Sequence, residues 1–434
     1  MATTTHAVAL AAFVLVAVTV VGLGLVARPS GAVDAEHDVV VIEANQHGAV
    51  HINSSDPGTQ PVLLNGKDVL SIMAEYDAAL KQQISINEQQ QALIANQSKH
   101  IASLQKDVCS LHPPRLSWVE EGVPSSSNKW SGGVLAANGF IYGVPLEATM
   151  VPIIHPAAGT IDTVTMSSIP AGSNKWHGGV LAPNNNAIYC APSTFDSVLK
   201  IDPSTNTADW TTMEGAGFAT DKFADVVLGH NGLIYGIPFH ATFVLIIDPY
   251  TDTIDTTTLE GLDSSHWKWW GGVAVPDGRI FGIPRNEDSV LIIDPETNTY
   301  DLTSLAGLGA GGNKWLSGVL ANNGLVYGIP YGSDSVLIID PVAMTTNTNA
   351  ITGLPGNDHL IGGLLSANGK VVGIPYDADY VLLIDPDTNT ADITTLAGVP
   401  PTAHKYRGGV LADNNLIYAI PDAAQNVMVI DLGC

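Results

Sequence analysis

The 434-residue chain has little cysteine and few basic residues, and each shortage excludes a class of protein. Its three cysteines, Cys109, Cys190 and Cys434, are too few for a disulfide framework and show no metal-type spacing. Lys and Arg total 17 against 42 Asp and Glu, a formal net charge of −25. Such a surface repels phosphate backbones, so we expect no nucleic-acid partner.

Sequence motifs typical of catalysis or metal binding are also missing. The sequence contains no Gly-x-Ser-x-Gly nucleophile motif and no calcium loop of the Asp-x-Asp-x-Asp-Gly type. We therefore expect no cofactor and no metal. The sequence favours a non-enzymatic role and leaves catalysis open.

An uncharged apolar run occupies residues 7–27 and is followed by Arg28. We interpret residues 1–32 as either a secretory signal peptide or a membrane anchor. Both alternatives predict a protein that is secreted or held at the cell surface, with a possible membrane tether.

Two further segments precede the main domain. Residues 33–66 contain strand-like patches separated by turn residues, which predicts a small β-rich segment. Residues 67–112 can be written as heptads with Met73, Leu80, Ile94 and Ile101 among the a positions. The heptads predict a coiled-coil stalk that could join three copies of the chain, and a solitary amphipathic helix is the open alternative.

Internal repeats dominate the rest of the chain. Seven copies of one unit begin at aromatic or apolar residues spaced 46, 47, 46, 46, 45 and 46 apart. These opening residues are Trp130, Trp176, Phe223, Trp269, Trp315, Leu360 and Tyr406.

Each unit reads as four short strands. An apolar GGVLA-like run, a tight Asn-containing hairpin, an IYGIP-like run, a VLIIDP run and an alternating strand follow one another. Four strands in about 46 residues are typical of one propeller blade. Residues 115–434 are therefore predicted to form an all-β, seven-bladed β-propeller.

The seventh copy ends without a fourth strand, and the missing strand is found upstream. Leu116–Pro124 aligns with Asp392–Pro400, so we expect the N-terminal strand to complete the last blade and close the ring. This closure would bring Cys109 near Cys434, where a disulfide is possible. Cys190 replaces a strand glycine and is predicted to be a small buried residue.

The residues repeated in every unit are best explained as scaffold. We predict that the opening aromatics are wedges between blades and that the glycine pair after them is required where blades crowd the axis. The Asp that ends the third strand in six copies is predicted to cap a turn, and the first copy has His155 in its place.

One repeated residue could instead form a binding site. A lysine precedes the opening aromatic in six copies, and a histidine replaces it in the sixth. We predict that these residues either form a basic ring that binds an anion at the channel mouth or pair with nearby acids. The residues are Lys129, Lys175, Lys222, Lys268, Lys314, His359 and Lys405.

Departures from the repeat are a second source of candidates. Asp225 stands where other copies have a glycine and is predicted to face the axis, and residues 267–270 form a tryptophan-rich cluster. The histidines fall at different repeat positions, which favours surface or satisfied interior residues.

The phrase NGLIYGIPFHATFVLIIDPYTDT, residues 231–253, resembles the repeats of YVTN-type surface propellers and, more loosely, kelch-type repeats. The resemblance covers about three quarters of the chain and implies extracellular binding or scaffolding. The aromatic ahead of the glycine pair departs from the kelch pattern. We predict a binding protein for an anionic glycan or an acidic protein; the alternatives are a propeller glycan lyase or hydrolase and a structural surface or matrix protein.

Overall fold

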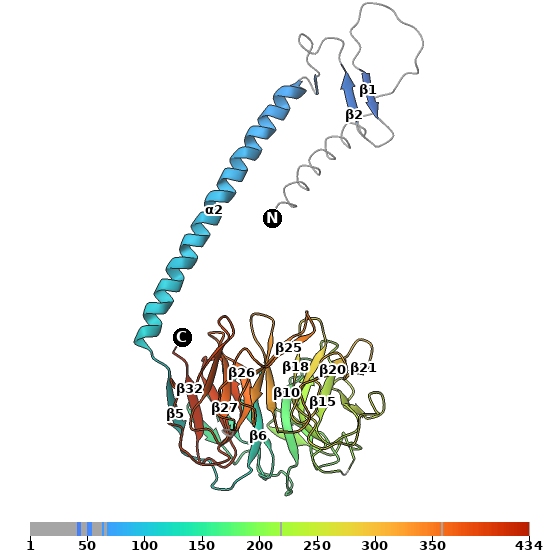
Figure 1. The fold of residues 1–434 in the computed structure, drawn as a ribbon, viewed down its shortest axis with the longest axis vertical. Coiled ribbons are helices and arrows are strands. Elements are labelled where there is room, and N and C mark those ends of the chain that lie inside the picture. The colour runs from blue at the N-terminus through green and yellow to red at the C-terminus, as the bar shows by residue number, and fades with distance from the viewer. Residues whose placement is uncertain are drawn as a thin grey trace, which may run out of the picture. The chain divides into compact units, whose positions relative to one another are not determined.

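The computed structural model describes residues 41–44, 50–53, 63–64, 67–217, 219–356 and 359–433 (Figure 1). The chain divides into two compact units that separate between Leu104 and Gln105. The predicted leader at residues 1–32 lies outside the described residues, as do Cys434 and the side chain of Cys109, so the predicted disulfide lies outside them too.

The first unit contains short strands and most of a long helix. β1 (Val41–Ala44) pairs antiparallel with β2 (Val50–Asn53), and β3 (Leu63–Leu64) pairs with β4 (Lys67–Asp68). The helix α2 follows at once and spans Val69–Leu111, which is 43 residues. The small β segment and the coiled-coil stalk stay predictions.

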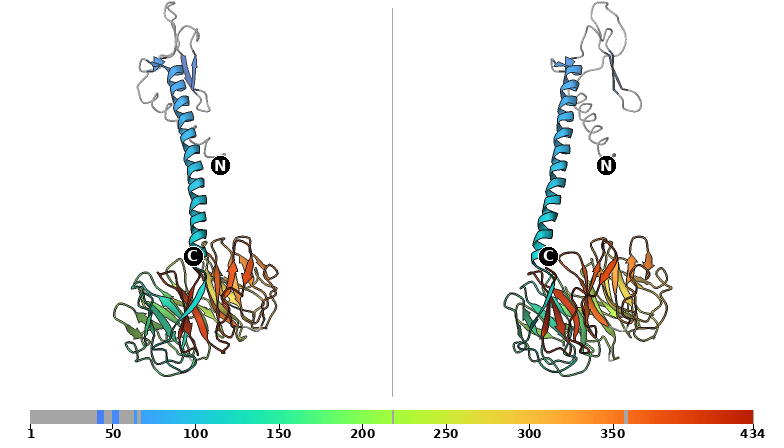
Figure 2. Two further views of the ribbon diagram at one scale, coloured as in Figure 1. Left: turned by 90° about the vertical axis from the view of Figure 1, so that its left-hand side faces the viewer. Right: turned by 60° about the vertical axis from the view of Figure 1, so that its left-hand side comes forward.

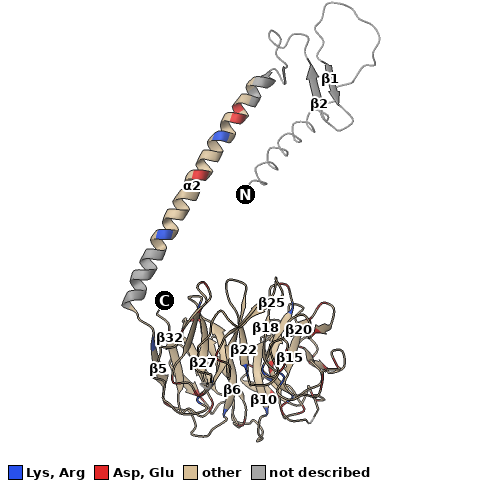
Figure 3. Ribbon diagram, in the orientation of Figure 1, with Lys and Arg blue, Asp and Glu red and all other residues tan. Residues whose placement is uncertain are grey.

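Helix α2 leaves apolar side chains in contact with solvent. Tyr76, Leu80, Ile94 and Ile101 are between 49% and 73% exposed. Charged residues are sparse along the described part of this helix (Figure 3). No helix in the described part of the chain combines the length and the hydropathy needed to cross a bilayer.

The second unit contains seven four-stranded sheets within the described residues, which confirms the predicted seven-bladed propeller (Figure 1). The innermost strands are β6 Trp130–Leu135, β10 Trp176–Leu181, β14 Phe223–Leu228, β18 Trp269–Ala274, β22 Trp315–Leu320, β26 Leu360–Leu365 and β30 Tyr406–Leu411. The second strands are β7 Ile141–Pro145, β11 Ile188–Pro192, β15 Ile234–Pro238, β19 Ile280–Pro284, β23 Val326–Pro330, β27 Val371–Pro375 and β31 Ile417–Pro421.

The outer strands of the first six blades are shorter than the inner ones. The third strands are β8 Ile153–His155, β12 Leu199–Asp202, β16 Leu245–Asp248, β20 Leu291–Asp294, β24 Leu337–Asp340, β28 Leu382–Asp385 and β32 Val427–Asp431. The fourth strands are β9 Thr160–Asp162, β13 Thr207–Asp209, β17 Thr253–Asp255, β21 Thr299–Asp301, β25 Thr345–Asn347, β29 Thr390–Asp392 and β5 Arg115–Val119.

The ring closes through the predicted N-terminal strand. β5 pairs antiparallel with β32, with Leu116 opposite Ile430 and Trp118 opposite Met428. Both views in Figure 2 show β5 beside the C-terminal strands. Every blade is therefore a complete four-stranded sheet.

The repeated aspartates cap turns, as predicted. The Asp248 carboxylate accepts the Tyr250 N–H at 2.8 Å, and the Asp294 carboxylate accepts the Glu296 N–H at 2.9 Å. A carboxylate that satisfies a turn amide explains the recurrence of Asp at this position without a metal.

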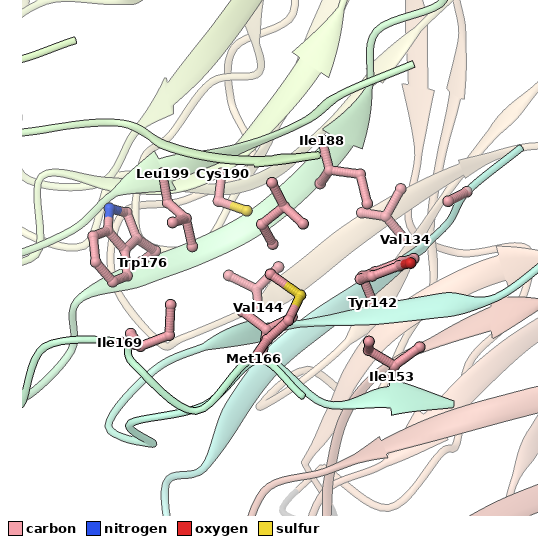
Figure 4. Close-up of a cluster of buried hydrophobic side chains, with 13 residues drawn as sticks. Val134, Tyr142, Val144, Ile153, Met166, Ile169, Trp176, Ile188, Cys190 and Leu199 are labelled. Carbon is pink, nitrogen blue, oxygen red and sulfur yellow. The ribbon is translucent and has the colours of Figure 1, made fainter. Parts of the chain in front are cut away.

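The opening aromatics lie between blades, as predicted. Trp176 is fully buried and its indole N–H donates to the Ser197 carbonyl at 2.8 Å. Figure 4 shows it among side chains of two neighbouring blades, including Val144 and Leu199. Cys190 lies in the same cluster as a free, buried thiol, and burial raises its pKa.

Glycine is required where the innermost strands meet. A Cβ on Gly362 would lie 2.4 Å from the Cα of Gly408, and Gly362 has a φ of 93°. No side chain fits so close to a neighbouring backbone. The predicted steric role of this glycine is confirmed, and the blades approach the axis closely enough to narrow the central channel.

Candidate ligand-binding site

The six repeated lysines are buried among backbone carbonyl groups. Lys129, Lys175, Lys222, Lys268 and Lys405 are at most 2% exposed, and Lys314 is half-buried. Each ammonium group donates to the carbonyl three residues earlier, in the loop that enters its blade. These acceptors are Ser126, Gly172, Ala219, Ser265, Gly311 and Thr402.

Several of these lysines also reach back to the preceding blade. Lys222 donates to the carbonyls of Ser193 at 2.8 Å and Phe195 at 2.9 Å, besides that of Ala219 at 3.1 Å. Burial lowers the pKa of Lys129, Lys175 and Lys222 to about 8. The lysines therefore tie neighbouring blades together.

The expectation of free ammonium groups around the channel mouth is corrected by this geometry. These acceptors are carbonyl oxygens, while the predicted acids act at longer range: Asp196 acts electrostatically on Lys222, and Asp288 on Lys314. At the sixth position the partner is a carboxylate: His359 Nδ1 lies 2.6 Å from Asp377.

The pocket on the axis is lined by the innermost strands of all seven blades and has a volume of about 240 Å³. Its polar side chains include Ser131, Asp225 and Arg407, and Trp270 borders it as well. Strand pairing places the first residue of each innermost strand opposite the last residue of the second strand, as with Trp269 and Pro284. One end of the pocket is therefore surrounded by residues from these strand ends.

Asp225 faces the axis, as predicted. Its carboxylate accepts the Val226 N–H at 2.9 Å, and burial raises its pKa to about 6. The carboxylate lies against Gly178, where an added Cβ would overlap its oxygen. The hydrogen bonds found for Asp225 come from backbone amides, which gives it no partner for acid–base chemistry among the described side chains.

Two repeat positions vary from blade to blade, and both lie at this end of the pocket. The residue after the opening aromatic is Ser131, His177, Ala224, Trp270, Leu316, Ile361 or Arg407. The residue after the second-strand proline is Leu146, Ser193, Phe239, Arg285, Tyr331, Tyr376 or Asp422. We call the surface formed by these two sets, with the loop residues that contact them, the channel-mouth site.

Arg285 is the most unusual residue of the channel-mouth site. Its guanidinium carbon lies 5.1 Å from the ring centroid of Phe239, 5.5 Å from Trp267, 5.6 Å from Trp270 and 5.6 Å from Tyr331. Within the described part of the chain, its hydrogen-bond acceptor is the Asn313 side chain, which accepts from Nε at 2.9 Å. The terminal nitrogens are thus held by aromatic rings and not by a carboxylate.

The second arginine of the site is satisfied by its neighbours. Arg407 donates from Nε to the buried Asp422 carboxylate at 2.6 Å and from Nη2 to the Tyr376 hydroxyl at 3.0 Å. Its guanidinium also lies 5.2 Å from the Tyr376 ring. Arg285 therefore carries the free positive charge of the site.

Three buried side-chain atoms of the described chain lack a hydrogen-bond partner, and all three belong to this surface. They are Ser193 Oγ, His240 Nε2 and Asp422 Oδ1. Ser193 and Asp422 directly follow the second-strand proline, and His240 is one residue further on. Buried polar atoms are nearly always hydrogen-bonded, so three unpaired atoms at one end of the propeller are unusual.

Five histidines that seemed scattered in the sequence gather at or beside this site. His177 is buried with Nδ1 2.7 Å from Ser131 Oγ, and burial lowers its pKa to about 3. His359 stacks on Tyr331 at 4.1 Å and His404 on Tyr376 at 4.7 Å. His240 and His266 pack against each other at 4.6 Å.

Comparisons of the sequence give no relatives. No family model matches the chain, and no curated protein matches it. The resemblance to YVTN-type and kelch-type repeats is therefore not confirmed.

Comparison of the structure finds other propellers. Streptogramin B lyase and the virginiamycin B lyase of Staphylococcus aureus are each 11% identical, with a TM-score of 0.58 over 73% of this chain and 97% and 99% of theirs. The extracellular domain of a hybrid two-component system from B. thetaiotaomicron is 11% identical, with a TM-score of 0.56 over 74% of this chain and 43% of that one. At this identity the likeness establishes the propeller fold alone.

Sequence reasoning missed Arg285, Tyr331, Tyr376 and Arg407, although it had marked the cluster at residues 267–270. The available signal was variability: these residues occupy the repeat positions that change from copy to copy between invariant neighbours. No group of three or more metal-ligating side chains occurs among the described residues.

Proposed function

We propose that this chain is an extracytoplasmic binding protein that holds an anionic ligand at the channel-mouth site. The observation that carries the proposal is Arg285, a half-buried guanidinium that four aromatic rings surround and that no described carboxylate neutralises. A site with aromatic walls and a few convergent polar groups is typical of small-molecule binding.

The proposed location has two supports. The apolar run at residues 7–27 suits either export or membrane anchoring. Structures of similar fold include extracellular domains of one-component and hybrid two-component systems. The protein would thus be secreted or tethered at the cell surface.

A propeller enzyme acting on a glycan, as a lyase or hydrolase, is the second candidate function. One observation favours it: the Asp377 carboxylate orients His359 at 2.6 Å, as a carboxylate orients a general base. Release of product from an oligosaccharide by the full chain, lost on replacing His359 with Asn, would favour catalysis over binding.

Replacing Arg285 with Ala is expected to weaken ligand binding by about 10- to 100-fold, because hydrogen bonds to a charged group contribute about 1.5–3 kcal/mol. The measurement is binding of the full chain to an array that carries neutral, carboxylated and sulfated glycans and acidic peptides. The matched control is Arg279→Ala. Arg279 lies at the opposite end of β19 and is likewise stacked on an aromatic ring, Phe281, at 5.3 Å.

The control variant should retain the binding of the unchanged protein. Equal losses in both variants, or retained binding in Arg285→Ala, would contradict the proposal. The same array tests the lysines, because substituting them should act through stability and not through the choice of ligand.

We further propose that α2 associates with α2 of two other copies to form a trimeric stalk. Leu80, Ile94 and Ile101 occupy a positions and remain exposed on the single helix. Asn87 at an a position, and Gln83, Gln90 and Gln97 at d positions, could pair with identical amides across the interface, which would fix the register of identical chains.

The double variant Ile94→Asp, Ile101→Asp is expected to be monomeric, because charges at core positions prevent association. Sedimentation of the unchanged chain should give three times the 45.4 kDa chain mass. The control Ala95→Asp places a charge at a b position and should stay trimeric. A monomeric unchanged chain would refute the stalk.

A further inference from the structure

Trp267 adopts a backbone conformation that its side chain disfavours. Its φ is 61°, in the left-handed region, where a bulky residue is a marked outlier. Most equivalent positions in other blades carry residues that tolerate this region: Asn128, Asn174, Asp221, Asn313 and His404. Backbone strain of this kind clusters at functional sites.

Packing does not explain the tryptophan, because Trp267 is 46% exposed. Its ring instead stands beside the free cation of the site, 5.5 Å from the Arg285 guanidinium, and is tilted toward the His240 ring at 6.4 Å. An exposed indole next to a guanidinium offers a flat apolar surface and a carboxylate-binding fork in one place.

The charges around the site limit the ligand to few negative groups. Arg407 is already neutralised by Asp422. Asp221 acts electrostatically on Arg285, and Asp377 on Tyr331, so both carboxylates lie near the site. A polyacidic peptide or a heavily sulfated chain would be repelled by these acids, whereas hydroxyl groups could donate hydrogen bonds to them.

We infer that the ligand is an oligosaccharide containing a hexuronic acid, with one sugar ring stacked on Trp267 and its carboxylate bound by Arg285. The inference rests on the proposed binding function and names its ligand class. A pyranose ring presents an apolar C–H face to the indole, its carboxylate fits the guanidinium fork, and its hydroxyls meet the acids and imidazoles around it.

The test is calorimetric titration of the full chain with three probes: tri-galacturonic acid, its fully methyl-esterified form, and hexa-aspartate. The acid trisaccharide should bind at least tenfold more tightly than the ester or the peptide. Arg285→Ala should remove the preference of acid over ester, because only the guanidinium distinguishes them.

Trp267→Asn should weaken binding of the acid trisaccharide at least tenfold without lowering the melting temperature, because Asn suits the left-handed backbone. A merely structural tryptophan would do the reverse. The control Tyr250→Asn removes an aromatic that is 69% exposed on an outer turn, and it should bind like the unchanged chain.

The outcomes separate the two proposals. Arg285-dependent binding of hexa-aspartate that exceeds binding of the trisaccharide would overturn the sugar inference and leave the anion-binding function standing. Tight binding of the trisaccharide by Trp267→Asn would also overturn the sugar inference. If none of the probes binds in an Arg285-dependent way, and the array shows no Arg285-dependent ligand, both proposals fail.

Discussion

Lys222→Met is expected to lower the free energy of unfolding by about 3 kcal/mol, because it leaves buried carbonyl oxygens without their charged donor. Lys222 is 2% exposed and donates to the carbonyls of Ser193, Phe195 and Ala219. Methionine keeps most of the side-chain volume, so the loss would report on the hydrogen bonds and not on a cavity. Urea unfolding followed by tryptophan fluorescence measures the change.

Lys200→Met is the matched control for this experiment. Lys200 pairs with Asp252 at 2.6 Å, but the two side chains are 23% and 32% exposed. Partly exposed ion pairs contribute at most about 1 kcal/mol. If both variants lost the same free energy of unfolding, the hydrogen bonds from Lys222 to the three carbonyls would contribute no more than an exposed ion pair, and the prediction would be wrong.

Asp225→Asn is expected to stabilise the propeller at pH 7 by about 2 kcal/mol. The folded protein raises the pKa of Asp225 from 3.8 to about 6, a difference worth about 3 kcal/mol before its partial contact with solvent is discounted. Asparagine has no charge to bury, and its carbonyl oxygen can still accept the Val226 N–H.

The contribution of Asp225 to the free energy of unfolding depends on pH. Between pH 3.8 and 6 the folded state binds more protons than the unfolded state, so the Asp225 contribution to stability falls as pH rises through this window. In thermal unfolding, the stability gained by Asp225→Asn over the unchanged protein should therefore grow from pH 4 to pH 7. A difference that does not vary with pH would contradict a raised pKa.

The propeller could be predicted from the sequence because its determinants are local and repeated. The Asp that caps each turn, the wedge at Trp176 and the glycine at Gly362 act within one blade or between adjacent blades, so each copy of the repeat tests the same interpretation. Ring closure was also visible, because Leu116–Pro124 is a displaced copy of a fourth strand.

The site could not be predicted in the same way. A lysine in the sequence does not show where its side chain points. It also does not show that the carbonyl three residues earlier accepts a hydrogen bond from its ammonium group in the folded loop. Arg285 and Tyr331 come from blades four and five, and their contact depends on the ring geometry. The residues repeated in every copy form the scaffold. The candidate site is formed by the residues that differ from copy to copy.

Closure by β5 also determines when folding of the propeller can be completed. Arg115 lies opposite Asp431, so the strand synthesised first in this domain has no sheet to join until the last strand has left the ribosome. Pairings so distant in sequence form slowly. A chain truncated before Val427 would leave both β31 and β5 with open edges, which are natural templates for aggregation.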